Sequence, residues 1–346
     1  MNISEEIKYS GLYQLLIRVC DPSIAEQLLR CVTVPEILVR PLGEQVSRAE
    51  LAHALNMILF ADLLKRVPEA RLYVDEKQQN EQTVFLDHGA VRTVVGVDTG
   101  ALPAGRRAFA RFLEALGFYE KEVYPLDKIK MTGYAYCHKD YPEEIAQFFV
   151  SELNTALFSK QFNDACTNVL MTSVDPLDQP ALERLAILRS DKQLSLEESC
   201  LLLTALSRCF NRHHSTPRLE DYQILAAESS EMAWIATEGS AYNHITDRVD
   251  DVQALSDEQK RLGLAMKETI EVSRRGTVRQ TAYRATMVSR EFLDSKGNTV
   301  TKTVPGSFIE FIDRAHIQLG EQTLLDLAFD ASNAQGIFKM TEANQT

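Results

Sequence analysis

The stretch TVFLDHGAVRTVVGV, residues 83–97, decides how the chain is expected to fold. It is rich in β-branched and apolar residues, and a second stretch of this kind, AYNHITDRV, occupies residues 241–249. Each stretch contains one histidine, His88 in the first and His244 in the second. Two such strands at distant places in the chain predict that each begins one copy of a repeated β-rich unit.

The sequence after each of these strands has the same outline. In the first copy, helical spacing is followed by Gly117, which is typical of a helix end, and then by three short β-rich runs. The elements expected after residues 83–97 are a helix at 103–116 and strands at 118–126, 129–138 and 145–153. In the second copy we expect a helix at about 256–272 and β-rich runs at 280–294 and 299–315, with a turn at 295–298.

The position of one glutamate supports the repeat. Glu152 lies in the last strand of the first copy and Glu310 in the last strand of the second. They follow His88 and His244 by 64 and 66 residues, respectively. The pattern therefore predicts two βαβββ modules, with Glu152 and Glu310 as equivalent residues.

The remaining sequence has helical periodicity. Capping boxes, Ser-x-x-Glu, stand at Ser47 and Ser195 before long apolar runs, and Pro217 suits the first turn of a later helix. We expect an α+β protein whose two modules form a curved, partly closed sheet wrapped by helices. Its predicted parts, all in one compact domain, are an N-terminal helical region at 1–82, the first module at 83–153, a helical insertion at 154–240, the second module at 241–314 and a C-terminal tail at 315–346.

Composition narrows the function classes. The 346 residues are 45% hydrophobic and 25% charged, with a net charge of −12 and no run of Lys and Arg, which disfavours nucleic acid and anionic membranes as partners. Apolar stretches such as 57–61 are too short to span a bilayer, and residues 1–10 do not resemble a signal peptide. Six cysteines without C-x-x-C spacing indicate reduced, mostly buried thiols. We expect a cytoplasmic protein that acts on small molecules and that is either a monomer or a homo-oligomer.

Two imidazoles and one carboxylate are a recognised ligand set for non-haem Fe(II), and they leave positions for substrate and dioxygen. Side-chain alternation allows His88, His244 and Glu310 to point into one cavity of the sheet. Taken singly, each residue is more simply a hydrogen-bonded histidine or a solvated glutamate. Their recurrence in the repeat favours a metal site. Thr246 and Arg248 follow His244 at even spacing, so we expect them to face the same side and to meet a ligand or the substrate.

The motifs DHGAVR, YNHITDRV and PGSFIEFIDR resemble those of the 2-oxoadipate dioxygenase/decarboxylase family, which is related in fold to the vicinal oxygen chelate enzymes. The resemblance covers residues 84–314. It implies that His88, His244 and Glu310 are the catalytic metal ligands, that Arg92 holds a substrate carboxylate, and that the cofactor is Fe(II), with other divalent metals also compatible. The implied partners are a small 2-oxo acid and O2. The implied reaction converts 2-oxoadipate to 2-hydroxyglutarate and CO2, as in lysine catabolism.

The sequence departs from the family pattern in three places. Asp87 stands where the family often has arginine, Asp247 stands where it often has proline, and the better-known members continue further at the C-terminus, in a region that helps to shape the substrate pocket. The substrate is therefore a less firm expectation than the metal site. Two alternatives remain open, a non-oxidative metalloenzyme such as an isomerase or hydrolase, and a non-catalytic carboxylate-binding protein.

Three further histidines are weaker candidates for the site. His213 and His214 are adjacent, so we expect them to point apart at a helix end or in a loop, and His138 is expected in a solvated turn that could line the pocket. Glu152 is interpreted as a vestige of the repeat or as a residue behind the ligands. The lone Trp234 is expected to pack a helix onto the sheet.

Overall fold

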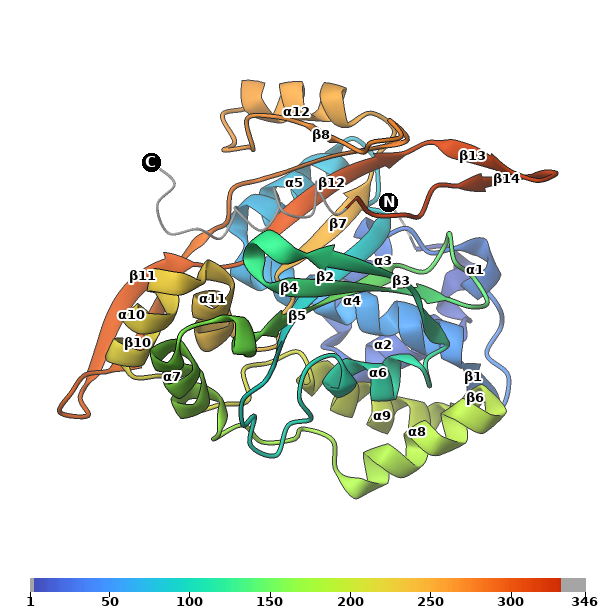
Figure 1. The fold of residues 1–346 in the computed structure, drawn as a ribbon. Helices are drawn as coiled ribbons and strands as arrows, with labels where there is room; N and C mark the ends of the chain where they lie inside the picture. The colour runs from blue at the N-terminus through green and yellow to red at the C-terminus, as the bar shows by residue number, and fades with distance from the viewer. Residues whose placement is uncertain (1–2, 331–346) are drawn as a thin grey trace.

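A computed structural model describes residues 3–330 of the chain, and its centre is a curved eight-stranded sheet (Figure 1). The strands of this sheet are β2 (Leu86–Val95), β3 (Phe118–Leu126), β4 (Met131–His138), β5 (Gln147–Asn154), β7 (His244–Arg248), β8 (Glu271–Val272), β9 (Val278–Ala282) and β12 (Phe308–Arg314). Their order across the sheet is β3-β4-β5-β2-β7-β12-β9-β8.

The order of the strands confirms the predicted α+β class and the two βαβββ modules. In the first module β2 pairs parallel with β5, and in the second β7 pairs parallel with β12. The first strands of the two modules, β2 and β7, pair antiparallel with each other and join the modules into one sheet. The two histidine-bearing strands therefore lie side by side in the middle of the sheet.

The second module differs in detail from the prediction. Its helix α12 covers Val252–Arg261 rather than 256–272, because Asp251 caps its first turn and Gly263, at a φ of +83°, follows its last residues. Each long β-rich run is also divided between the sheet and a separate hairpin. This hairpin, β10 (Met287–Leu293) with β11 (Thr299–Pro305), projects from the body at the left of Figure 1.

Helices cover the sheet, as predicted for the N-terminal region. Helix α4 (Arg48–Arg66) contacts β7, α5 (Pro68–Gln79) contacts β12, and α11 (Ser230–Glu238) contacts β2. The remaining short strands are β1 (Gln45–Ser47), β6 (Gln193–Ser195), β13 (His316–Leu319) and β14 (Gln322–Leu325). The other α-helices are α1 (Glu5–Lys8), α2 (Gly11–Val19), α3 (Pro22–Cys31), α6 (Arg107–Leu113), α7 (Lys160–Leu170), α8 (Gln179–Asp191), α9 (Leu196–Arg208) and α10 (Leu219–Glu228).

The two predicted capping boxes begin α4 and α9, and they lie next to each other. Ser47 and Glu50 form both hydrogen bonds of the box, whereas at α9 Ser195 accepts from the Glu198 N–H and the Glu198 carboxylate binds Arg184 instead. The strands β1 and β6 that precede these helices pair antiparallel. The middle helical region thus contains a strand and capped helix like those of the N-terminal region. Pro217 lies just before α10 rather than in its first turn.

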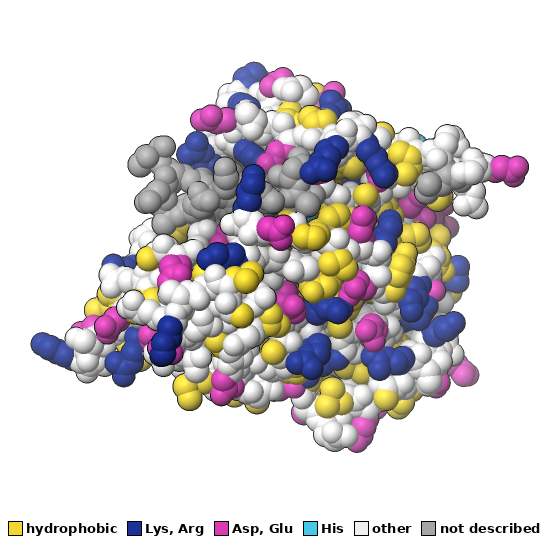
Figure 2. Space-filling model, viewed as in Figure 1, with side chains coloured by type: hydrophobic (Ala, Val, Ile, Leu, Met, Phe, Trp, Pro, Cys, Tyr) yellow, Lys and Arg dark blue, Asp and Glu magenta, His cyan; other side chains and the backbone are white. Residues whose placement is uncertain are grey.

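Charged side chains of both signs are interspersed on the face shown in Figure 2. Within residues 3–330, no helix has the length and apolar content required to cross a lipid bilayer. All six cysteines are free thiols, and four of them are buried. The prediction that most of the cysteines are buried is therefore confirmed.

A buried carboxylate ties helix α5 to the central strand β7. Asp247 accepts hydrogen bonds from the Tyr73 hydroxyl at 2.6 Å, the Lys77 ammonium at 2.8 Å and the Phe85 N–H at 2.8 Å. Its side chain is fully buried, and this burial raises its pKa. Asp247, which stands where the family often has proline, thus satisfies three donors in the interior.

We expect Asp247→Ala to lower the free energy of unfolding by about 3–5 kcal/mol, because the variant leaves a largely buried ammonium without its carboxylate. Chemical denaturation followed by circular dichroism measures this. The matched control is Asp164→Ala, which breaks the exposed Lys160–Asp164 pair and should change stability by less than about 0.5 kcal/mol. Equal effects of the two substitutions would contradict a structural role for Asp247.

Candidate metal centre

Three neighbouring strands place the candidate ligands in two adjacent rows of the sheet. In one row His88 on β2 is opposite Thr246 on β7, which is opposite Glu310 on β12. In the next row Ala90 on β2 is opposite His244 on β7. Because side chains two residues apart share a face, both rows project into the same concave side of the sheet.

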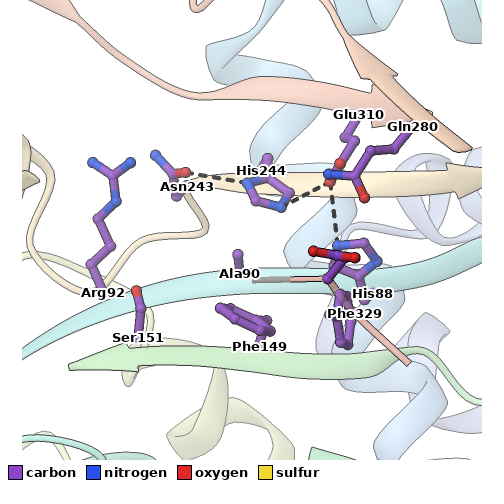
Figure 3. A pocket seen from close by; sticks show the side chains of 11 residues that line it. His88, Ala90, Arg92, Phe149, Ser151, Asn243, His244, Gln280, Glu310 and Phe329 are labelled. Carbon is purple, nitrogen blue, oxygen red and sulfur yellow. Dashed lines mark hydrogen bonds and ion pairs between the residues drawn. The ribbon is translucent and has the colours of Figure 1, made fainter. Parts of the chain in front are cut away.

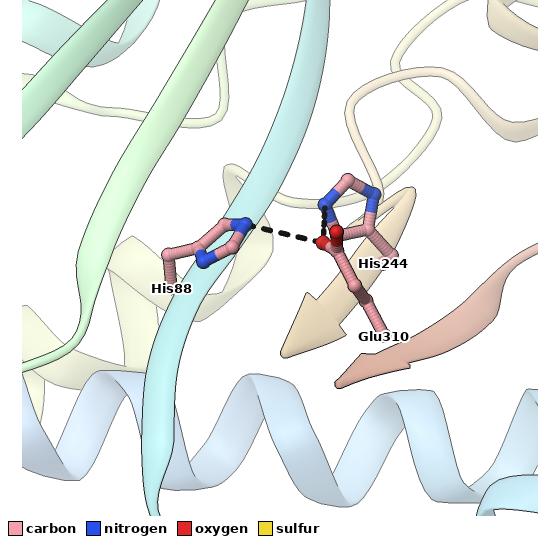
Figure 4. Close-up of side chains that lie close together, drawn as sticks. All are labelled: His88, His244 and Glu310. Carbon is pink, nitrogen blue, oxygen red and sulfur yellow. Dashed lines mark ion pairs between the residues drawn. The ribbon is translucent and has the colours of Figure 1, made fainter. Parts of the chain in front are cut away.

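The three predicted ligands converge on one another (Figure 4). One ligand atom from each of His88, His244 and Glu310 lies within 4.8 Å of the others. The Oε2 atom of Glu310 is 3.3 Å from His88 Nε2 and 3.1 Å from His244 Nε2. The Thr246 hydroxyl donates to Glu310 Oε2 at 2.8 Å and lies 3.1 Å from His88 Nε2. All three candidate ligands are buried, with at most 6% of each residue exposed.

Each histidine is oriented by the residue that precedes it. The Nδ1 of His88 is 2.9 Å from Asp87 Oδ1, and the Nδ1 of His244 is 3.2 Å from Asn243 Oδ1. These acceptors favour the tautomer that carries the proton on Nδ1 and leaves the Nε2 lone pair facing the centre. In a regular strand Asp87 and His88 would point to opposite faces. A β-bulge between Leu86 and His88 removes this restriction.

Asp87 is also the centre of a buried charge network. Arg314 and Arg248 both donate to its carboxylate, at 2.8 and 2.7 Å at the nearest. Burial opposes ionisation of Asp87, but the two guanidinium groups outweigh it and hold its pKa well below the ordinary value. The partner of His88 is therefore a permanent anion.

Burial and the neighbouring charges shift the pKa values of the three candidate ligands in different directions. Burial disfavours an ionised Glu310, but hydrogen bonds and charge interactions with His244 and His88 outweigh it and lower its pKa. Burial lowers the pKa of His244. For His88, burial is outweighed by Asp87 and Glu310, so its pKa is raised. Glu310 is consequently held as an anion among donors.

The centre is at one end of a cavity, and Arg92 is at the other (Figure 3). Ala90 and Phe149 lie between them, and Ser151 lines the wall beside Arg92. Arg92 is 2% exposed, and burial lowers its pKa to about 10. Its guanidinium carbon is 5.1 Å from the ring centroid of Trp234. A cation thus faces a largely apolar cavity.

The donor set fits a divalent transition metal. Two neutral imidazole nitrogens and one carboxylate oxygen suit Fe(II), and also Mn(II), Co(II), Ni(II) and Zn(II). The non-ligating nitrogen of each histidine has an acceptor, as metal-binding histidines usually have. His88, His244 and Glu310 could therefore hold such an ion.

Residues 49–341 match the family described as 2-oxoadipate dioxygenase/decarboxylase. The chain belongs to this family. Within the 2-oxoadipate dioxygenase/decarboxylase family, the chloroplastic enzyme of Arabidopsis thaliana is 28% identical over 148 residues. That match covers 37% of this chain and 38% of the plant protein.

Two solved structures share the fold. A glyoxalase superfamily protein from Ralstonia eutropha JMP134 is 48% identical, with a TM-score of 0.88 over 92% of this chain and 98% of the other. The hydroxyglutarate synthase of Oryza sativa, solved with 2-oxoadipate, is 21% identical, with a TM-score of 0.64 over 88% of this chain and 97% of the other. The likeness to the glyoxalase superfamily confirms the predicted vicinal-oxygen-chelate-like fold.

The structure brings together some of the residues predicted to bind substrate and separates others. Arg92 lines the cavity, whereas Thr246 lies between His88 and Glu310 and contacts both. Arg248 is elsewhere, because it binds Asp87 and the carbonyl of Glu143. The roles of Arg92, Thr246 and Arg248 in substrate binding stay predictions, and Arg248 contacts Asp87, the partner of His88.

The weaker candidates have structural partners. Glu152 accepts from the Arg106 N–H at 2.8 Å at the start of α6, away from the three ligands. His138 is fully buried rather than in a solvated turn, and its ring bonds the backbone of Leu116 and of the turn at 140–141. His213 and His214 each lie within hydrogen-bonding distance of a backbone carbonyl, of Cys209 and of Ala236.

Sequence reasoning did not identify Asp87 and Asn243 as partners of the histidines. The signal was present, since each histidine follows a residue with a side-chain oxygen, in Asp87-His88 and Asn243-His244. It also did not anticipate the environment of Trp234. This residue packs a helix near the sheet, as expected, but its indole also donates to the Gly306 carbonyl and its ring faces Arg92.

We expect His244→Ala to weaken the binding of Co(II) at least about 100-fold, since removing a ligand costs no less than removing a partner of one. Isothermal titration calorimetry under anaerobic conditions measures the affinity. The control is His316→Ala, which changes an exposed histidine of β13 and should leave the affinity unchanged. Retention of tight binding by a folded His244→Ala protein would exclude this centre as the metal site.

Asp87→Asn should weaken Co(II) binding by about 10–100-fold, because the neutral amide polarises the His88 ring less than the carboxylate does. The control Asp175→Asn changes another carboxylate paired with arginine, Arg111, which is not part of this centre. The same titration measures both proteins. Equal affinities for the two variants would show that Asp87 does not act on the metal site.

Proposed function

We propose that the protein is a non-haem Fe(II) dioxygenase that oxidatively decarboxylates a small 2-oxo dicarboxylic acid, with 2-oxoadipate as the leading substrate. The reaction takes up O2 and yields 2-hydroxyglutarate and CO2. The observation that carries the proposal is the arrangement of the cavity, with the His88, His244 and Glu310 centre at one end and Arg92 at the other.

A 2-oxo dicarboxylic acid matches the two ends of this cavity. The 2-oxo acid group of such a substrate has two oxygens that suit a divalent metal. The second carboxylate requires a fixed cation, and the Arg92 guanidinium offers a fork of donors with the matching planar geometry. His88 and Arg92 are on the same face of β2, four residues and therefore roughly 13 Å apart. The rice structure named above contains 2-oxoadipate, which supports this choice of substrate.

The chain's own side chains would exclude water and fix the reacting groups. Phe149 and Phe329 pack against each other with ring centroids 5.0 Å apart, and Phe329 meets the ring of His88 at 4.8 Å. Together with Ala90 they give the middle of the cavity an apolar lining. A bound Fe(II) would supply the activation of dioxygen and the polarisation of the 2-oxo acid.

The Thr246 hydroxyl is placed between two of the candidate ligands. Its hydroxyl donates to Glu310 Oε2 and lies beside His88 Nε2, so it can keep the carboxylate turned toward the centre. Burial of the whole group strengthens these interactions, since the local dielectric is low. The ligand side chains are thus held together before substrate binds, which limits the reorganisation that binding requires.

A non-oxidative metalloenzyme would use the same donors, because two imidazoles and one carboxylate do not select iron by themselves. This second candidate function is favoured by one observation, that the 48% identical structure is described as a glyoxalase superfamily protein. Oxygen uptake separates the two candidates.

Anaerobic reconstitution with Fe(II), followed by addition of 2-oxoadipate in aerated buffer, should give equimolar oxygen uptake and CO2 release. We expect no uptake by His244→Ala. Arg92→Met should retain the metal but lose about 100-fold or more in kcat/KM, since a charge-assisted hydrogen-bonded pair is removed. 2-Oxoglutarate and 4-hydroxyphenylpyruvate are the comparison substrates.

An oxygen electrode measures oxygen uptake, and 13C-labelled substrate measures CO2 release independently. Stoichiometric iron without oxygen uptake on any 2-oxo acid would contradict a dioxygenase. Conversion of substrate without oxygen would favour the non-oxidative candidate.

A further inference from the structure

The two modules are related by an approximate twofold axis between β2 and β7. Their antiparallel pairing places His88 opposite Thr246 and Ala90 opposite His244. A half-turn about this axis exchanges β2 with β7, and it therefore superposes His88 on His244 and Ala90 on Thr246. The parallel pairings extend the same relation outward, since His88 is opposite Gln147 on β5 and His244 is opposite Phe308 on β12.

This register identifies the true counterpart of Glu310. Glu310 lies two residues after the partner of His244, and the residue two after the partner of His88 is Phe149. The sequence-based pairing of Glu310 with Glu152 is therefore wrong. Glu152 lies three residues further along β5 and binds the Arg106 N–H. Residue counts gave a near match only because the loops of the two modules differ in length.

The four equivalent positions bear three ligands and one phenylalanine. His88 and Glu310 project from one row of the sheet, and His244 and Phe149 project from the next. Phe149 is 6% exposed and lines the cavity, as Figure 3 shows. It packs on Tyr124 and Phe329, so apolar rings occupy the side of the centre that lies across from Glu310.

A second pair of equivalent positions, Thr246 and Ala90, also distinguishes the two halves of the site. Thr246 lies between His88 and Glu310 and hydrogen-bonds to the carboxylate, whereas its counterpart Ala90 lies between His244 and Phe149 and has no polar side-chain atom. The half of the site that would hold a fourth ligand thus lacks both the ligand and its supporting hydroxyl. This is also the half that leads to Arg92 and Ser151.

We propose that Phe149 occupies the place of a fourth protein ligand, so that the side of the centre facing Arg92 stays open for a small-molecule ligand. A carboxylate at this place would close the site with four protein ligands. The inference rests on the metal site of the proposed function. The ligand-transfer experiment requires neither a particular substrate nor oxygen, and 2-oxoadipate serves only as the probe of the open side.

A ligand transfer across the axis tests this. Glu310→Phe should weaken Co(II) binding at least about 100-fold, and the double variant Glu310→Phe/Phe149→Glu should recover it to within about tenfold of the unchanged protein. The matched control is Glu310→Phe/Phe149→Gln, in which glutamine at position 149 has the size of glutamate without its charge. This variant should not recover Co(II) binding. Calorimetry and the visible spectrum of Co(II) measure binding, and circular dichroism confirms folding.

The single variant Phe149→Glu gives an independent measurement. It should bind Co(II) at least about tenfold more tightly than the unchanged protein, and 2-oxoadipate should no longer alter the visible Co(II) spectrum. Phe149→Leu should retain both the original affinity and the spectral response. Phe149→His replaces Phe149→Glu in both experiments if the buried carboxylate prevents folding, with the same expected results.

A folded double variant that does not recover Co(II) binding would overturn the proposal, as would a Phe149→Glu protein whose Co(II) spectrum still responds to 2-oxoadipate. These results are separable from the fate of the proposed function. If the transfer succeeds but the iron-loaded protein consumes no oxygen, the inference stands and the dioxygenase is excluded. If the unchanged protein oxidises 2-oxoadipate but the transfer fails, the reverse holds.

Discussion

The antiparallel pairing of β2 with β7 is the constraint on which the rest of the site depends. It joins segments that are far apart in the chain and fixes His88 and His244 one row apart on the same face. A slip of one residue would turn every side chain of one strand to the opposite face and separate the two imidazoles. Burial on both faces specifies this register. On the outer face Gly89 has no side chain, and an added Cβ would lie 2.5 Å from the ring of Tyr242, whose hydroxyl donates to Asn56 on α4.

A buried charge network links strand β2 to the chain segment at the edge of the cavity. Arg314 donates to Asp87 and also to the carbonyl groups of Asp326 and Ala328. The chain that follows brings Phe329 against the ring of His88, and the Phe329 N–H donates to the Tyr124 hydroxyl. One guanidinium thus positions both the partner of a candidate ligand and the backbone beside the apolar wall. Because Asp87 has two cationic partners, its buried charge is compensated without a proton.

Much of this could be predicted from the sequence, because periodicity and strand composition are local properties. The two β-rich strands and the modules they begin follow from alternation and repetition. Alternation also allows His88, His244 and Glu310 to point into one cavity, but their choice as a ligand set is what the family resemblance implies. The register of the strands cannot be predicted in this way, since it depends on loop lengths and on the partner strand. Counting residues therefore pairs Glu310 with Glu152, whereas the register pairs it with Phe149. The β-bulge at Asp87 is equally non-local. It allows Asp87 to contact its neighbour His88, and Arg248 binds Asp87 rather than entering the cavity.

The asymmetry between the two modules accounts for the division of labour in the site. Equivalent positions hold Thr246 and Ala90, Glu310 and Phe149, and Arg248 and Arg92. Glu310 is a candidate ligand, Thr246 hydrogen-bonds to it and Arg248 binds Asp87, whereas the three residues of the first module line the cavity. A symmetric pair of modules would surround the centre with equivalent side chains and leave no preferred side for a substrate. The modules therefore differ in side-chain type at two of these pairs and in the contacts made by the third, and the cavity has one polar end, an apolar middle and a cation at its far end.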